Sequence, residues 1–315
     1  MWNRFDYLNN KMALPVNQHW VPQFYLREFA IPETRAAKEA YVWIFSRNEE
    51  DGIEKKTNIR NICAKRYLYS PHSDSGERDY EVDGMLNDLE TILSQMWRDI
   101  AWDYVNLADD ALRKAVSLFV ANMYMRHPSN LELSKRVHSH LVKMYEQAPK
   151  KSNGIPNIDC FIHNGKKYEI DSSDWHSYNS WNENDHRAAF ASLILKETYD
   201  ITEILIKKRW SIGLIDAEYL ITSDKPVSIQ HQSRQVFGIG TLGARITFPL
   251  SPTRILIMDD LHQEPCNQYY QISEENIGAF NYGIWCAASR FLITGRQIPD
   301  VLSEMAEWIE KNANQ

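Results

Sequence analysis

The spacing of apolar residues predicts a helical zone in the middle of the chain. Between residues 80 and 148, apolar side chains recur at intervals of three and four, which is typical of amphipathic helices. Asp109 or Asp110 has the short acidic side chain that caps the start of a second helix, and Pro128 is expected to end that helix. A third, more polar helix is expected over residues 130–147.

Short strands are predicted on both sides of this zone. Residues 41–45 (YVWIF) are rich in β-branched and aromatic side chains and precede a polar turn, and residues 65–69 form a second candidate. The pair Asn164-Gly165 is a strong hairpin signal. Beyond a long helix that starts near Asn184, further short strands are expected at residues 210–215, 219–222, 227–230, 245–248, 254–258 and 291–294.

This order of elements indicates an α+β fold. Neighbouring strands joined by turns favour a mixed, largely antiparallel sheet, with a helical subdomain inserted in the middle of the chain. No linker divides the 315 residues, so we expect a single domain with three sub-regions. These are an N-terminal α/β segment over 1–80, the helical subdomain over 81–150 and a C-terminal α+β segment over 151–315.

The charge balance restricts the partners that we expect. The chain carries 35 Lys and Arg against 42 Asp and Glu, a net charge of −7. That balance argues against a protein that coats nucleic acid, but it leaves room for a local basic groove. One segment interleaves cations with aromatic rings: Lys55, Lys56, Arg60, Lys65, Arg66, Tyr67 and Tyr69. Such a segment suits unpaired bases and phosphates, and the alternative is a solvated strand edge protected by lysines.

The sequence also bears on location. No run approaches the ~18 apolar residues of a membrane helix, and residues 1–15 lack the apolar core of a signal peptide. We therefore expect a cytoplasmic protein with no membrane partner. The four cysteines form no C-x-x-C pair, which argues against a structural zinc site.

His19 and Asp224 are the first candidates for a catalytic role. His19 follows the polar residues 17 and 18 and precedes a short helix predicted over residues 22–29. At such a position an imidazole serves as a general base, a metal ligand or a capping group. Asp224 follows a short strand, and Pro226 forces Lys225 into an extended conformation, so the carboxylate is held where it can bind a metal or orient a histidine. The structural alternatives are a backbone hydrogen bond for His19 and an Asx-turn for Asp224.

Glu90 is the third catalytic candidate. It lies along the apolar face of the first long helix, where a carboxylate must be paired, hydrogen-bonded or a ligand. A buried ion pair with an arginine is the favoured alternative. Thr222 and Ser223 are expected either to bind a substrate or to hydrogen-bond within the turn at Asp224. The sequence leaves the cofactor open, and a divalent metal is one alternative.

Three segments resemble the bacterial family known as domain of unknown function 4238. They are residues 17–29 (NQHWVPQFYLREF), 220–227 (LITSDKPV) and, more weakly, 248–252 (FPLSP). They occur in the family's order and span most of the chain. The resemblance implies a role in bacterial anti-phage defence. The candidate substrate-binding residues are Gln23 and Tyr25 in the first segment, Lys65, Arg66, Thr222 and Ser223.

Two functions from different classes follow as hypotheses. The first is a defence effector that acts as a hydrolase or nuclease on nucleic acid or nucleotide, with His19 as base and Asp224 as orienting group or ligand. The second is a non-enzymatic sensor that recognises a phage component as its trigger and acts through a partner. A cleft that brings His19 and Asp224 together with one of Glu81 or Glu90 would favour the enzyme.

Overall fold

The computed structural model describes residues 16–47, 54–163 and 165–312, and these residues form an α+β fold as predicted. The helices are α1 (Gln23–Glu28), α2 (Pro32–Arg35), η2 (Ile59–Asn61), α3 (Glu81–Trp102), α4 (Asp110–Met125), α5 (Pro128–Glu146), α6 (Trp175–Asn179), α7 (Glu183–Lys207), α8 (Glu274–Ala287) and α9 (Ile298–Asn312). The inserted helical subdomain corresponds to α3, α4 and α5.

The strands form two larger sheets and two separate ribbons. Five strands lie in the order β12-β7-β11-β10-β9, four in the order β3-β2-β13-β8, and the ribbons are β1-β4 and β5-β6. Every pairing is antiparallel except that of β12 with β7. The strands are β1 (Asn17–His19), β2 (Tyr41–Ser46), β3 (Glu54–Asn58), β4 (Ala64–Arg66), β5 (Cys160–His163), β6 (Lys166–Glu169), β7 (Arg209–Leu214), β8 (Thr222–Ser223), β9 (Ser228–Gln230), β10 (Arg245–Ser251), β11 (Arg254–Asp259), β12 (Gln268–Gln271) and β13 (Phe291–Thr294).

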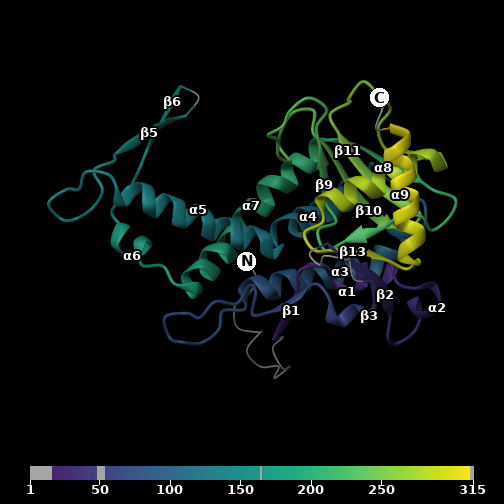
Figure 1. Cartoon of the computed structure of the whole chain (residues 1–315), viewed down its shortest axis with the longest axis horizontal. Helices are drawn as coiled ribbons and strands as arrows, with labels where there is room; N and C mark the ends of the chain where they lie inside the picture. The colour runs from purple at the N-terminus through teal and green to yellow at the C-terminus, as the bar shows by residue number, and fades with distance from the viewer. Residues whose placement is uncertain (1–15, 48–53, 164, 313–315) are drawn as a thin grey trace.

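The main core contains a cluster of aromatic rings from α1, α3, α4 and β10. Trp97 packs edge-on against Phe119 at a centroid distance of 4.9 Å, and Tyr25 stacks on Phe248 at 5.2 Å. These rings explain part of the chain's aromatic content, because large rings supply most of the apolar area that a core buries. The helices α8 and α9 lie beside the sheets, at the right of the view (Figure 1).

The helix caps agree with the sequence in one place and differ in another. The Asp109 side chain accepts a hydrogen bond from the Leu112 N–H at 2.8 Å, as expected for the cap of α4. The expectation for Pro128 is wrong: α4 ends at Met125, and Pro128 is the first residue of α5. The fixed φ of proline and its missing N–H suit the first helical position.

The helices α5 and α6 and the hairpin β5–β6 form an arm that projects from the two sheets (Figure 1). The hairpin lies where the sequence predicts it, although Asn164 itself is outside the described residues, and Gly165 has a φ of 76° that glycine tolerates. The arm joins the rest of the molecule at the start of α5 and again through α7, which follows α6 in the chain (Figure 1). In the part of the chain that the structure describes, no helix has the length and apolar character needed to span a membrane.

Candidate functional site: a basic pocket beside Asp224

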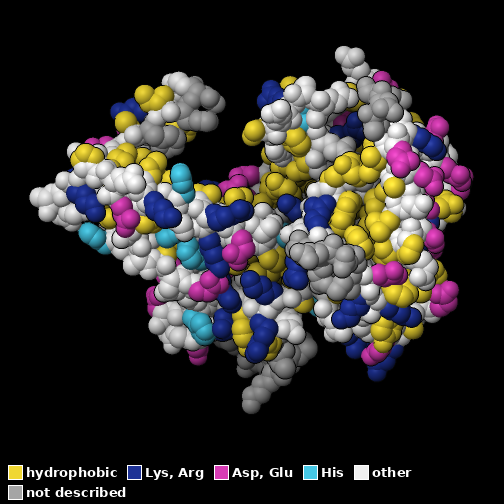
Figure 2. Space-filling view, viewed as in Figure 1, with side chains coloured by type: hydrophobic (Ala, Val, Ile, Leu, Met, Phe, Trp, Pro, Cys, Tyr) yellow, Lys and Arg dark blue, Asp and Glu magenta, His cyan; other side chains and the backbone are white. Residues whose placement is uncertain are grey.

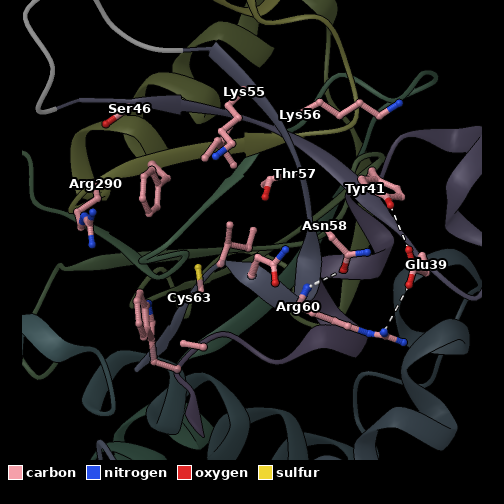
Figure 3. A pocket seen from close by; sticks show the side chains of 16 residues that line it. Glu39, Tyr41, Ser46, Lys55, Lys56, Thr57, Asn58, Arg60, Cys63 and Arg290 are labelled. Carbon is pink, nitrogen blue, oxygen red and sulfur yellow. Dashed lines mark hydrogen bonds and ion pairs between the residues drawn. The ribbon is translucent and has the colours of Figure 1, made fainter. Parts of the chain in front are cut away.

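A cavity of about 810 Å³ opens at the edge of the four-stranded sheet, between β3, η2 and the start of β13. Its cationic lining residues are Lys55, Lys56, Arg60 and Arg290, and Glu39 is the one carboxylate among the described residues that line it. Lys55 and Thr57 lie on one side of the cavity, Arg290 on another and Cys63 opposite Lys55 (Figure 3).

The strand β3 carries the lysines because it is the edge strand of its sheet. It pairs with β2 alone, with Lys55 opposite Ile44 and Lys56 opposite Trp43. Lysines on an edge strand hinder its pairing with other chains. This protection of a solvated strand edge is the structural alternative to ligand binding for this segment. The same lysines also line the cavity, so the edge is both protected and positively charged.

Asp224 holds the segment that carries Arg290 into the pocket. The Asp224 side chain has no exposed surface. Its Oδ1 accepts hydrogen bonds from the N–H groups of Ser289 at 3.0 Å and Phe291 at 3.3 Å, and the Arg290 N–H donates to both carboxylate oxygens, to Oδ2 at 3.0 Å and to Oδ1 at 3.2 Å. The Asp224 carbonyl accepts a hydrogen bond from Trp20 Nε1 at 2.9 Å. Asp224 therefore positions lining residues on two sides of the cavity.

His127, which the sequence did not single out as a partner of Asp224, lies next to this carboxylate. Its Nε2 is 3.7 Å from Asp224 Oδ2, and its Nδ1 accepts a hydrogen bond from the Ser129 N–H at 3.0 Å. Because Nδ1 is an acceptor, the proton of the neutral ring is on Nε2 and faces Asp224. The ring also packs edge-on against Trp20 at 5.8 Å. The sequence did contain a signal for this histidine, because the polar pair Arg126-His127 directly follows a predicted apolar helix.

Glu90 pairs with an arginine, which was the favoured alternative for this residue. Arg126 Nη1 lies 2.7 Å from Glu90 Oε1, and Arg126 Nε donates to the Trp20 carbonyl at 2.8 Å. The Arg126 side chain is 1% exposed and that of Glu90 is 24% exposed. Glu90 thus neutralises a buried guanidinium that supports the backbone of Trp20.

His19 is paired with a residue of the pocket lining but is not itself among the described residues that line the pocket. It is directly opposite Ala64, which lines the pocket, in the β1–β4 ribbon, and opposite residues of an antiparallel pair share a face. Its Nε2 is 3.3 Å from Gln23 Nε2. Burial lowers the pKa of His19 and the charge of Arg126 lowers it further, while the Ile62 carbonyl partly opposes them. The imidazole is therefore neutral at pH 7 and able to accept a proton.

Three candidate substrate-binding residues lie inside the protein. Tyr25, Thr222 and Ser223 have no exposed surface. The Tyr25 hydroxyl is 2.7 Å from Thr222 Oγ1 and donates to the Pro249 carbonyl at 2.9 Å, and Ser223 Oγ accepts from the Lys225 N–H at 3.1 Å. Their roles in binding stay predictions, and their contacts hold the loop at Asp224 in place.

The remaining candidates lie on or near the surface. Gln23 and Arg66 are exposed and Lys65 is half-buried. Within the described residues, no hydrogen bond or ion pair joins His19 to Asp224, because Asp224 faces the segment before β13 whereas His19 faces Gln23. Both candidates adjoin Trp20 instead: His19 precedes it in the chain, and the Asp224 carbonyl accepts a hydrogen bond from its indole Nε1.

The contacts above join all three of the segments singled out in the sequence, since Trp20 bonds to Asp224 and Tyr25 to Pro249. The family described as protein of unknown function (DUF4238) matches residues 17–297. The chain belongs to this family. In this DUF4238 chain the three segments thus form one hydrogen-bonded unit under the pocket. No curated protein and no solved structure matches the chain. Among the residues that can be described, no three His, Cys, Asp or Glu side chains group as metal ligands.

Proposed function

We propose that this protein binds a nucleotide or nucleic acid in the pocket at β3. The observation that carries the proposal is the charge of the lining, in a chain whose net charge is −7. Arg60 lies 3.6 Å from Glu39 and is balanced by it, which leaves the cations of Lys55, Lys56 and Arg290 in excess. Cations concentrated in one cavity of an acidic protein attract anionic ligands to that cavity. Phosphates are the anions for which lysine and arginine side chains are most often used.

The other lining residues suit the rest of a nucleotide. Tyr41 and Phe291 are half-buried and offer aromatic rings to a base, and the guanidinium of Arg290 lies 4.8 Å from the ring centre of Phe291. Asn58 offers both a donor and an acceptor to a base edge. The volume of about 810 Å³ falls within the usual range of ~300–1,000 Å³ for small-molecule sites.

The proposal includes a hydrolytic step in anti-phage defence, with His19 as the general base. Its support is the lowered pKa of His19 and its place opposite Ala64 at the pocket wall. A neutral imidazole takes a proton from water as that water attacks a phosphorus atom. The phosphoester bond then breaks, and the leaving oxygen carries away the electron pair.

One observation favours a second candidate, a non-enzymatic sensor that uses the same pocket. The Asp224 carboxylate accepts hydrogen bonds from backbone N–H groups, and the Glu90 carboxylate is paired with Arg126. Both of the acids that the sequence offered to His19 therefore have structural partners. A sensor needs only the anion-binding pocket and a partner protein that responds to its occupation.

Binding measurements on side chains that point at the cavity test the proposal. Fluorescently labelled nucleotides and oligonucleotides are titrated against the native chain and against Lys55→Ala and Arg290→Ala. Each variant should weaken binding roughly tenfold and reduce its salt dependence. Lys196→Ala, an exposed lysine of α7 outside the pocket, is the matched control and should bind like the native chain. Equal affinities in all four proteins, or no binding by the native chain, would contradict the proposal.

His19→Ala separates the enzyme from the sensor. If the protein is a hydrolase, this variant retains binding and loses turnover of the bound nucleotide or oligonucleotide, with and without added divalent metal. If the native chain binds but never turns the ligand over, the sensor is the correct reading. Plaque counts with phage on bacteria that express each variant then show whether the pocket serves defence.

A further inference from the structure

The pocket wall continues along β4 to a second basic cluster. Ala64 lines the pocket, and Arg66 lies two residues further along the same strand. Alternate residues of a strand point to the same side, and two steps of ~3.3 Å place Arg66 about 7 Å past Ala64. The strand register confirms the shared face, because Ala64 is opposite His19 and Arg66 is opposite Asn17.

The second cluster surrounds the ring of Tyr67. The guanidinium of Arg78 lies 3.8 Å from the ring centre and that of Arg66 lies 5.7 Å from it. Arg187 Nη1 donates to the Tyr67 carbonyl at 2.9 Å. Three guanidinium groups thus meet around Tyr67, where Arg66 is exposed and the other three residues are half-buried. On the face shown in Figure 2, Lys and Arg side chains gather along α5 and over the region between α5 and β1.

Two of these arginines have structural tasks, and Arg66 has none that involves a hydrogen bond. Arg78 Nη1 donates to the Ser70 carbonyl at 2.6 Å, and Arg187 contacts Glu183 as well as Tyr67. In the described part of the chain, no hydrogen bond or ion pair holds the side chain of the exposed Arg66. Since like charges repel, a third guanidinium placed here is unfavourable for the free protein. An anionic ligand would reverse that effect.

We infer that the ligand is a single-stranded nucleic acid that occupies the pocket and extends along β4 to Arg66 and Tyr67. This inference rests on the proposed function. The ~7 Å step from Ala64 corresponds to about two nucleotides at the ~3.4 Å spacing of a stacked strand. Aromatic rings flanked by cations bind unpaired bases, whose faces are free, whereas the base faces of a duplex are stacked on each other. We expect a mononucleotide in the pocket to lack the further phosphate that Arg66 would contact.

A length series of ligands tests the inference. The native chain is titrated with a mononucleotide, with single-stranded DNA and RNA of two, four, eight and twelve nucleotides, and with a twelve-base-pair duplex. Affinity should rise from the mononucleotide to the tetranucleotide and exceed that for the duplex. Affinity that does not depend on length, or tighter binding of the duplex, would overturn the inference while the proposed function stands.

Arg66 variants locate the added contact. Arg66→Ala should leave mononucleotide affinity unchanged, weaken the eight-nucleotide strands about five- to tenfold and lower the salt slope by ~0.7, the value for one phosphate of a single strand. Arg66→Lys keeps the charge and should restore most of the affinity, and Arg234→Ala, an exposed arginine of the β9–β10 loop, is the control. An equal effect of Arg66→Ala on mononucleotide and strand would overturn the inference. Absence of any binding by the native chain would instead refute the proposed function, and the inference with it.

Discussion

Replacing Asp224 by asparagine tests whether this carboxylate builds the pocket. The change keeps the size of the side chain and one carbonyl oxygen, so the variant can still accept hydrogen bonds from the Ser289 and Phe291 N–H groups. The second oxygen becomes an amide NH₂, which cannot accept the shorter of the two hydrogen bonds that the Arg290 N–H donates, at 3.0 Å, although the contact of this N–H with Oδ1 at 3.2 Å remains. Two donors then face each other in a site with no exposed surface.

The expected cost of this change follows from its contacts. A hydrogen bond to a charged group contributes about 1.5–3 kcal/mol, and a buried donor without a partner costs about 1–3 kcal/mol. Loss of the shorter Arg290 contact, and of the negative charge that strengthens the remaining ones, should therefore destabilise the fold by about 2 kcal/mol. Asp224→Ala leaves all three N–H groups unpaired, and its cost approaches the whole stability of a typical domain, about 5–15 kcal/mol. Asparagine is the informative variant for that reason.

Urea unfolding followed by circular dichroism measures the change in the free energy of unfolding, and the titrations at the pocket measure its effect on binding. Asp224→Asn should weaken ligand binding, because Arg290 and Phe291 depend on the carboxylate for their position. The control is Asp74→Asn at an exposed aspartate, which should stay within about 0.5 kcal/mol of the native chain. A native-like free energy of unfolding in Asp224→Asn would refute the reasoning about the carboxylate.

Three further outcomes are expected. Burial raises the pKa of Asp83 to about 6, above ~3.9 in the unfolded chain. The protonated carboxyl therefore stabilises the fold below pH ~4, and this stabilisation is lost as the pH rises through 6. In urea unfolding, the free energy of unfolding of Asp83→Asn should increase relative to that of the native chain over this pH range, and a difference that stays constant would contradict this. Glu90→Gln leaves the buried Arg126 without its carboxylate and should lower the free energy of unfolding by about 2 kcal/mol. This is less than the ~3–5 kcal/mol of a fully buried pair, because Glu90 is partly exposed. An unchanged free energy of unfolding in urea would show that the pair contributes nothing. The pKa of His19 is lowered, so turnover that uses this histidine as the base should be independent of pH between about 7 and 8. A rate that rises steeply over that interval would exclude this role.

Local sequence patterns predicted much of the fold. The limits of β13 are those expected from the sequence, and α4 begins where Asp109 caps it, because caps and side-chain periodicity depend on residues within a few positions. The strand β3 was not predicted. Its lysines resemble a solvated segment, and only its pairing with β2 makes it a strand. Likewise, β12 forms because it pairs with β7, more than fifty residues earlier in the chain.

The candidate site shows the same division. The sequence by itself determined the α+β class, the three helices of the middle zone, the family segments and the candidates His19, Asp224 and Glu90. Only the tertiary structure decided what these residues contact. The Asp224 carboxylate meets N–H groups 65 to 67 residues further along the chain, and the pocket combines Trp20, β3 and Arg290. Such contacts arise because helices and sheets bury their apolar faces together, and a polar residue then bonds to whichever group that packing places beside it.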